Sequence, residues 1–253
     1  MLKMMKYEFL RNRVTLLVLG GILGGSEVIF LLGNMSRSGN LMGMGMVLLV
    51  FGSSVIYFTI WLLGLISFSR DLREKSGYMV FLAPVSPYKI VFSKMLLGLL
   101  ELLATGILLL MLASLDLKIL SSTTGSWKAS LAQILARYYG ITSDELWAGC
   151  AVLVIGGAFS VLTMYSIAYL GSAIAALVSR SGNSQKWLGI LFVFLILIVY
   201  IVIDHSLPEI KNNVRNEFVS AFVRQIPSFI FSAVVITGCS FGTGYLLDKK
   251  ISL

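Results

Sequence analysis

The chain has 253 residues, of which 57% are hydrophobic and only 13% are charged, and its mean hydropathy is +0.90. A soluble globular protein carries about 25% charged and about 45–50% apolar residues, and a core of this size cannot hide the excess. With only 4 prolines and 2 cysteines, the composition also excludes a disordered chain and a disulfide scaffold. What remains is a single polytopic membrane domain over residues 1–253, whose solvent is lipid.

Six hydrophobic runs are long enough to cross a membrane. A helix needs about 20 apolar residues to cross about 30 Å of hydrocarbon, whereas the strands of a membrane barrel read as alternating segments of about ten residues. The run at residues 191–203, LFVFLILIVYIVI, is continuous and therefore predicts a helix. The sequence predicts an all-α fold with six transmembrane helices, at about residues 14–32, 41–68, 90–112, 147–178, 187–203 and 229–247.

The basic residues are distributed unevenly over the connections between these spans. Thirteen of the 20 lysines and arginines fall on the side that holds the N-terminus, the loop at residues 69–94, the connection at residues 179–186 and the C-terminal tail. The positive-inside rule places that side in the cytoplasm. We therefore expect a multi-pass protein of the cell membrane, with both termini cytoplasmic and residues 113–146 as an extracellular loop.

The net charge of +8 is explained by this topology and by attraction to anionic lipid. No patch of interleaved basic and aromatic residues is present in the sequence, so nucleic acid is not an expected partner.

No motif in the sequence predicts catalysis. The chain has no Gly-Lys dipeptide and therefore no GxxxxGK[ST] phosphate loop, and it has neither HExxH nor CxxC. The single histidine, His205, has no other His or Cys at ligand spacing, so no metal site is expected. A GxSxG string at residues 238–242 lies inside the last span, where small-residue helix packing explains it better than a nucleophile does. We expect no enzyme activity in this chain itself.

The first residues of the chain suggest an interfacial helix. In residues 2–10, apolar side chains recur near helical spacing, opposite Lys3 and Lys6. The alternative is that this segment extends the first span.

The cytoplasmic loop at residues 69–94, SRDLREKSGYMVFLAPVSPYKIVFSK, is the most informative stretch. A charged turn leads to Gly77, then to an apolar cluster, then to Pro84 and Pro87 directly before the third span. Proline at these positions ends a helix and stiffens the chain. One interpretation is a short amphipathic helix whose apolar residues dock into a groove of a partner protein. The other is a solvated connector.

In this loop the order Arg73-Glu74-x-x-Gly77, then Phe81-Leu82-Ala83-Pro84-Val85-Ser86, then Lys94 resembles the corresponding loop of ABC-2 type permeases. Those are the membrane subunits of ABC exporters. The resemblance covers the whole chain in topology and about 25 residues in motif. It implies a type V ABC exporter-like fold: six transmembrane helices, an N-terminal interfacial helix, and a cytoplasmic coupling helix that seats in a cleft of a separate ATP-binding subunit.

The resemblance also implies roles. The matching positions would dock the ATPase; they are Arg73, Glu74, Gly77, Leu82, Pro84 and Lys94. ATP and Mg would then be bound by the partner subunit, and no cofactor by this chain. The implied function is ATP-driven export of a substrate such as an amphipathic peptide, a lipid or a drug. The sequence departs from the simplest family pattern in its outer loop at residues 113–146, which is longer than expected.

Two carboxylates, Glu27 and Glu101, lie within predicted spans. A charge at mid-bilayer costs about 2.5–3.5 kcal/mol on insertion scales, so such residues are expected to face protein or water. They are candidates for a transport pathway or for hydrogen bonds between helices. A proton pathway through them would make the chain an ion-coupled secondary transporter, which is the alternative function. That class is expected to show inverted repeats with broken helices, and no internal repeat is recognisable in the sequence.

Four glycines in the first span form two overlapping GxxxG spacings: Gly20, Gly21, Gly24 and Gly25. Small residues allow helices to approach closely, either within one chain or between two. Because six helices enclose little volume, we expect a dimer with a second copy or with a sibling permease.

Overall fold

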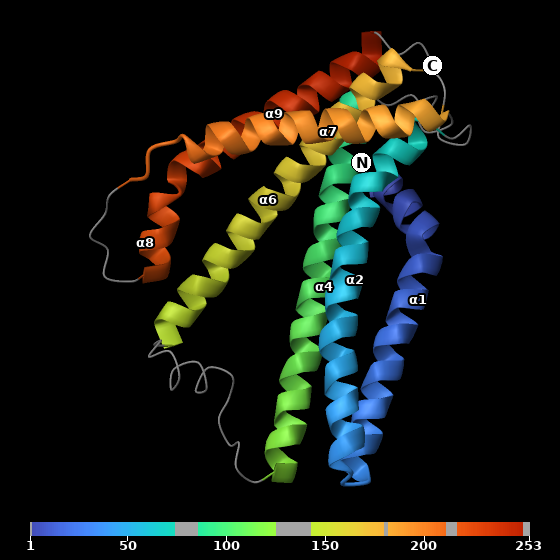
Figure 1. Ribbon diagram of the computed structural model, residues 1–253, viewed down its shortest axis with the longest axis vertical. Helices are drawn as coiled ribbons and strands as arrows, with labels where there is room; N and C mark the ends of the chain where they lie inside the picture. The colour runs from blue at the N-terminus through green and yellow to red at the C-terminus, as the bar shows by residue number, and fades with distance from the viewer. Residues whose placement is uncertain (1, 74–85, 125–142, 180–181, 211–216, 250–253) are drawn as a thin grey trace. The chain divides into compact units, whose positions relative to one another are not determined.

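The computed structural model describes residues 2–73, 86–124, 143–179, 182–210 and 217–249 (Figure 1). These residues form helices and no strand: α1 Leu2–Met35, α2 Gly39–Asp71, α4 Pro87–Thr124, α6 Ser143–Val178, α7 Gly182–His205, α8 Glu217–Arg224 and α9 Ile226–Lys249. All but α8 are long and apolar enough to cross a membrane. Even the 24-residue helices α7 and α9 reach about 36 Å, more than the hydrocarbon thickness. The expected all-α fold with six apolar helices is confirmed.

Each predicted span lies within one of these helices, but the helices continue beyond the apolar runs. Helix α4 extends to Thr124, through Asp116 and Lys118, and α6 begins at Ser143. Helical hydrogen bonding does not require apolar side chains, so hydropathy marks only the part of a helix that suits lipid. Both ends of the expected outer loop at residues 113–146 are therefore helical, and residues 125–142 lie outside the described residues.

Helix α1 is continuous from Leu2 to Met35. The segment at residues 2–10 thus forms the first turns of this long helix and is not a separate element. Its location at the membrane interface stays a prediction.

The chain divides into two compact units. Unit 1 comprises Met1–Met4, Leu63–Leu99 and Asp144–Leu253, and unit 2 comprises Met5–Leu62 and Leu100–Ser143. All four boundaries between the units fall inside helices, namely α1, α2, α4 and α6. Helices α2 and α4 each contribute one long segment to unit 1 and another to unit 2.

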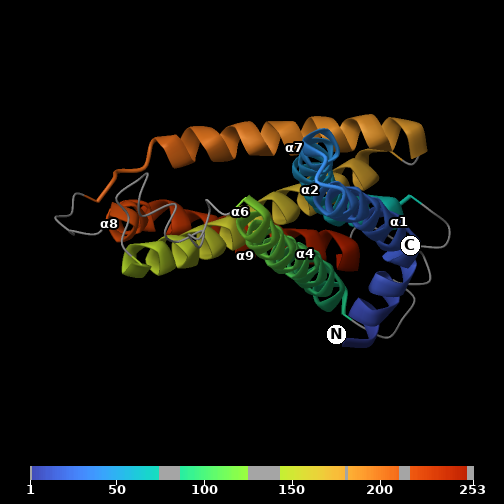
Figure 2. The same ribbon diagram turned by 90° about the horizontal axis from the view of Figure 1, so that it is seen from below.

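In unit 2, α1 and the first part of α2 form a helical hairpin, and the two helices lie side by side in both views (Figures 1 and 2). The turn places Arg37 in the left-handed region at φ 51°, and the Ser38 N–H donates to the Gly33 carbonyl at 3.1 Å. This is a common way to satisfy the last carbonyls of a helix. The backbones then approach closely, because a Cβ built at Gly45 would lie 2.6 Å from the Cα of Phe30.

In unit 1, two fully buried tyrosines of α6 form the centre of the core. The Tyr169 hydroxyl donates to the Gly64 carbonyl of α2 at 3.0 Å, and its ring stacks on Phe68 with centroids 4.6 Å apart. Tyr165 fills the space that two glycines leave open. A Cβ at Gly98 of α4 would lie 2.6 Å from Tyr165 Cε2, and one at Gly64 would overlap the Tyr165 hydroxyl.

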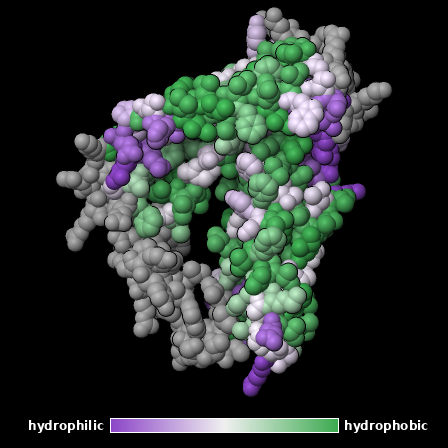
Figure 3. All heavy atoms as spheres, in the orientation of Figure 1, coloured by the Kyte–Doolittle hydropathy of each residue, from purple (hydrophilic) through white to green (hydrophobic). Residues whose placement is uncertain are grey.

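The outer surface of the long helices is apolar, as lipid requires. On the face that Figure 3 shows, apolar residues cover most of the area that the described residues occupy. Side chains such as Leu17, Val50 and Leu195 are at least half exposed. In a membrane, these side chains contact acyl chains.

The Gly98 contact gives a stability prediction. Replacing Gly98 by Ala adds a methyl group that Tyr165 cannot avoid without moving, and overpacking of this kind costs about 1–3 kcal/mol. Thermal unfolding of the purified protein in detergent is expected to shift downward accordingly. Gly157→Ala in α6 is the matched control, since a Cβ there meets nothing within 4 Å. Equal stability of the two variants would contradict the tight packing of Tyr165.

Candidate functional site

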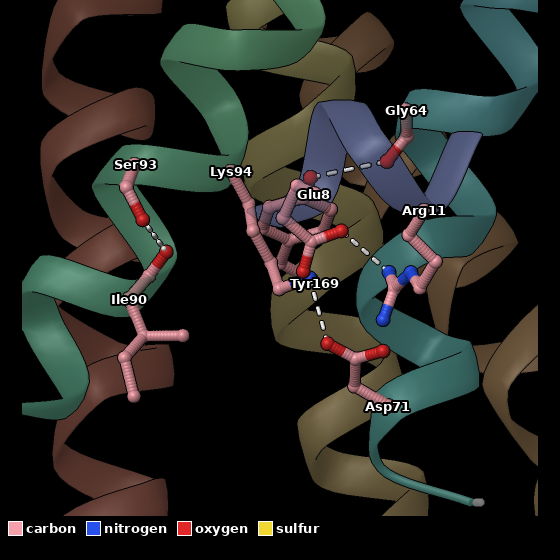
Figure 4. Close-up of polar contacts among 8 residues, drawn as sticks. All are labelled: Glu8, Arg11, Gly64, Asp71, Ile90, Ser93, Lys94 and Tyr169. Carbon is pink, nitrogen blue, oxygen red and sulfur yellow. Dashed lines mark hydrogen bonds and ion pairs between the residues drawn. The ribbon is translucent and has the colours of Figure 1, made fainter. Parts of the chain in front are cut away.

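The two ends of the expected loop at residues 69–94 are helical, since α2 ends at Asp71 and α4 begins at Pro87, and a buried ion pair joins these two helices. Lys94 Nζ, in the first turns of α4, lies 2.7 Å from Asp71 Oδ2, at the last residue of α2. The two side chains are only 2% and 1% exposed. Figure 4 shows the pair, with Ser93 of the same α4 turn donating to the Ile90 carbonyl at 2.8 Å. Both helix ends are therefore held at one buried point.

The local electrostatics explain why this pair is needed. A carboxylate at a helix C-terminus is disfavoured by the helix dipole, so Asp71 requires a nearby cation. A buried pair adds little net stability compared with apolar residues, but removing one partner leaves an uncompensated charge and costs about 3–5 kcal/mol. The pair thus fixes the relative position of the two helix ends more than it adds stability.

Two of the six predicted docking residues lie in the described part of the chain. Arg73 Nε donates to the Ser69 carbonyl at 3.0 Å and so caps the last turn of α2. Lys94 is 4% exposed, so any part it takes in docking would act through the position of α4. The other four lie outside the described residues: Glu74, Gly77, Leu82 and Pro84. The docking role of all six stays a prediction.

Asp71 is the residue of this candidate site whose pairing the sequence did not reveal. It stands in the charged turn next to Arg70 and Arg73, where a local pairing is the simplest expectation. The sequence feature that could have indicated the pair is an acidic residue at the end of the second span, Asp71, together with a lysine near the start of the third, Lys94.

Unit 2 contains a buried polar cluster within its long helices. Glu8 and Asn12 of α1 and Glu101 of α4 are 5%, 6% and 8% exposed. Glu101 lies within hydrogen-bonding reach of Asn12 and near the charge of Glu8. Glu8 in turn pairs with Arg11, one helical turn away (Figure 4). Glu101 therefore faces protein, as expected of a carboxylate within a span.

The second intramembrane carboxylate belongs to a separate cluster. The Glu27 side chain lies beside Asp116 of α4 and is partly exposed. Asn12 and Glu27 are about 22 Å apart along α1, as the helical rise of 1.5 Å per residue requires. The structure does not bring Glu27 and Glu101 together into one site.

The glycines of the first span form an open face on α1. A Cβ built at Gly20, Gly21, Gly24 or Gly25 would meet no atom within 4 Å, and all four positions are exposed. Among the described residues, these glycines therefore serve no close intramolecular packing.

Comparison of the chain with protein-family models, with curated proteins and with solved structures finds no match.

The ion pair can be tested with a double-mutant cycle. Asp71→Leu and Lys94→Met are each expected to lower the free energy of unfolding by about 3–5 kcal/mol, since each leaves a buried charge uncompensated. The decrease in the free energy of unfolding of the double variant is expected to be clearly smaller than the sum of the decreases of the two single variants. Unfolding of the purified variants, followed by near-UV circular dichroism, measures the cycle. Strictly additive losses would show that the two side chains do not interact.

Proposed function

We propose that the chain is the permease subunit of an ATP-driven ABC exporter. A separate ATPase subunit would bind ATP and Mg, and this chain would export a substrate such as an amphipathic peptide, a lipid or a drug. The observation that carries the proposal is the buried Asp71–Lys94 pair, which ties together the two ends of the loop that resembles a coupling helix. Six helices suited to crossing a membrane supply the framework.

The pair suits mechanical coupling because it makes two helices respond as one. Movement of one helix end without the other would separate the charges, at a cost of about 3–5 kcal/mol. A displacement of the loop by an ATPase would therefore reach α2 and α4 together. Each of these helices continues from unit 1 into unit 2, so the displacement reaches both units through unbroken backbone. In this proposal Arg73, Glu74, Gly77, Leu82 and Pro84 provide the contact with the ATPase.

The proposal includes a dimer that forms through the open glycine face of α1. Exposed glycines at GxxxG spacing let the backbones of two helices approach closely in lipid, where van der Waals packing drives association. The partner would be a second copy or a sibling permease.

One observation favours the alternative, an ion-coupled secondary transporter. The Glu101 side chain is buried beside Glu8 and Asn12, and its Oε1 atom has no hydrogen-bond partner in the described part of the chain. A carboxylate of this kind could bind and release a proton. The continuous helices α1 and α4 count against this alternative, since secondary transporters typically break helices at their ion sites.

The exporter proposal predicts a stoichiometric ATPase partner. When the tagged protein is purified from its native membrane in mild detergent, an ABC ATPase is expected to copurify and to hydrolyse ATP. Glu74→Ala, Leu82→Ala and Pro84→Ala are expected to lower its recovery severalfold. Arg37→Asn, in the turn between α1 and α2, is the control. Mass identification and an ATPase assay measure both. If no ATPase copurifies from several detergents and the reconstituted chain alone shows proton-dependent flux, the secondary transporter is the correct function.

The dimer can be tested at the glycine face. In a chain with Cys150 and Cys239 replaced by Ser, a cysteine at the exposed position Val28 is expected to form an inter-subunit cross-link in native membranes. Gly24→Ile should reduce that product severalfold, because its side chain separates the two backbones. Gly157→Ile in α6, which is equally open, is the matched control. Unchanged cross-linking in Gly24→Ile would place the interface elsewhere.

A further inference from the structure

A cavity of about 130 Å³ lies among α6, α7 and α9 in unit 1. Five hydroxyl side chains line it, although these helices otherwise present mostly apolar residues: Ser160, Thr163, Tyr200, Ser228 and Ser232. Polar side chains within a membrane span face a protein interior or a cavity. Their convergence from three helices distinguishes this cavity from an ordinary packing gap.

Two of the hydroxyls form a hydrogen bond that leaves one donor without an acceptor among the described residues. Tyr200 Oη and Ser232 Oγ are 2.9 Å apart, and either of them can be the donor. Each hydroxyl carries one hydrogen and two acceptor lone pairs, so whichever group donates, the other keeps its own hydrogen. Ser232 is 6% exposed, and Tyr200 is held by stacking on Phe231 with ring centroids 5.5 Å apart. The cavity therefore presents a positioned hydroxyl donor.

The remaining walls suit an aromatic ring. Phe159 and Phe229 meet edge to face, with centroids 5.5 Å apart, and Met164 lies beside them. Rings favour such arrangements, and methionine makes favourable contacts with rings. A cavity of about 150 Å³ in another protein accommodates benzene, so the size fits one ring.

The charge of the lining limits the ligand further. None of the described residues that line the cavity is acidic or basic. A charged ligand group would be buried there without a counter-charge, which is strongly unfavourable. An alkyl chain would fit the apolar walls but would leave the unused hydroxyl donor without a partner.

We propose that this cavity binds a neutral aromatic ring that carries a hydrogen-bond acceptor, as part of an amphipathic molecule that enters from the membrane. The ring lies against Phe159 and Phe229, and the acceptor takes the hydrogen that the Tyr200–Ser232 bond leaves unused. This binding requires no ATP and no partner subunit, so it can be tested independently of the exporter proposal.

The test uses a benzyl alcohol that carries a photoreactive diazirine, with the purified full-length chain in detergent. Labelling is expected to saturate and to concentrate on peptides around residues 159–164 and 228–232. Unlabelled benzyl alcohol should compete about two- to tenfold better than toluene, which lacks the acceptor. Benzylammonium, which is charged, should compete at least tenfold more weakly than benzyl alcohol.

A pair of glycine variants supplies the control. Gly156 lines the cavity, and a Cβ there would meet Phe229 only at an ordinary contact distance of 3.7 Å. Gly156→Leu should therefore fill the cavity and reduce labelling at least tenfold, whereas Gly157→Leu, whose side chain has open space, should label like the wild type. Tyr200→Phe/Ser232→Ala removes both hydroxyls without changing the walls much. It should abolish the preference for benzyl alcohol over toluene.

Three results would overturn the proposal. Labelling could spread evenly over all helices without saturating, which would mean partition into the detergent. Gly156→Leu could label as strongly as the wild type, which would place the ligand elsewhere. The double hydroxyl variant could keep the preference for benzyl alcohol, which would exclude the hydrogen bond. The last result remains decisive if Gly156→Leu does not fold.

Discussion

Hydrocarbon offers no hydrogen-bond partner to a peptide group, and this constraint governs the six long helices of the described chain. Each unsatisfied N–H or C=O would cost several kcal/mol in the bilayer core, so the six long segments are helices that satisfy their own backbones. Apolar side chains gain nothing by leaving lipid for protein, so burial alone cannot decide which helices become neighbours. Close contacts of small residues and polar pairs must decide it.

The structure contains both kinds of contact. In unit 2, Gly45 lets α2 approach Phe30 of α1, and in unit 1 Gly98 leaves space for Tyr165. Polar side chains add direction to this packing. Tyr169 binds the backbone of α2 at Gly64, and Asp71 pairs with Lys94 across the ends of α2 and α4. Each of these contacts joins two particular helices within one unit, so it specifies helix neighbours in that unit that hydrophobicity leaves undetermined.

The number and approximate position of the long helices could be predicted from hydropathy, because lipid sets a length and composition that few other segments meet. The full length of the helices could not be predicted in this way. Helix α4, for example, continues through Asp116 and Lys118, because helical hydrogen bonding does not depend on apolar side chains. Within the candidate site, Lys94 was found through a motif, but its pairing with Asp71 depends on how two helices face each other. No linear spacing encodes that.

The hydroxyl-lined cavity was missed for a similar reason. Its polar residues come from three helices, and only two short spacings were visible: Ser160 with Thr163, and Ser228 with Ser232. Residues three or four apart share one face of a helix, so each pair indicated a polar face. The sequence could not show that the two faces, together with Tyr200, meet around one cavity.

The buried pair of Asp71 and Lys94 also constrains the order of events during synthesis in the cell. Because the chain is made from its N-terminus, Asp71 emerges before its partner exists. Until α4 is inserted, this carboxylate must keep its hydration, so the loop end of α2 stays at the membrane surface. The burial of Asp71 against Lys94 is therefore a late step of biogenesis, because it cannot occur before α4 has been inserted.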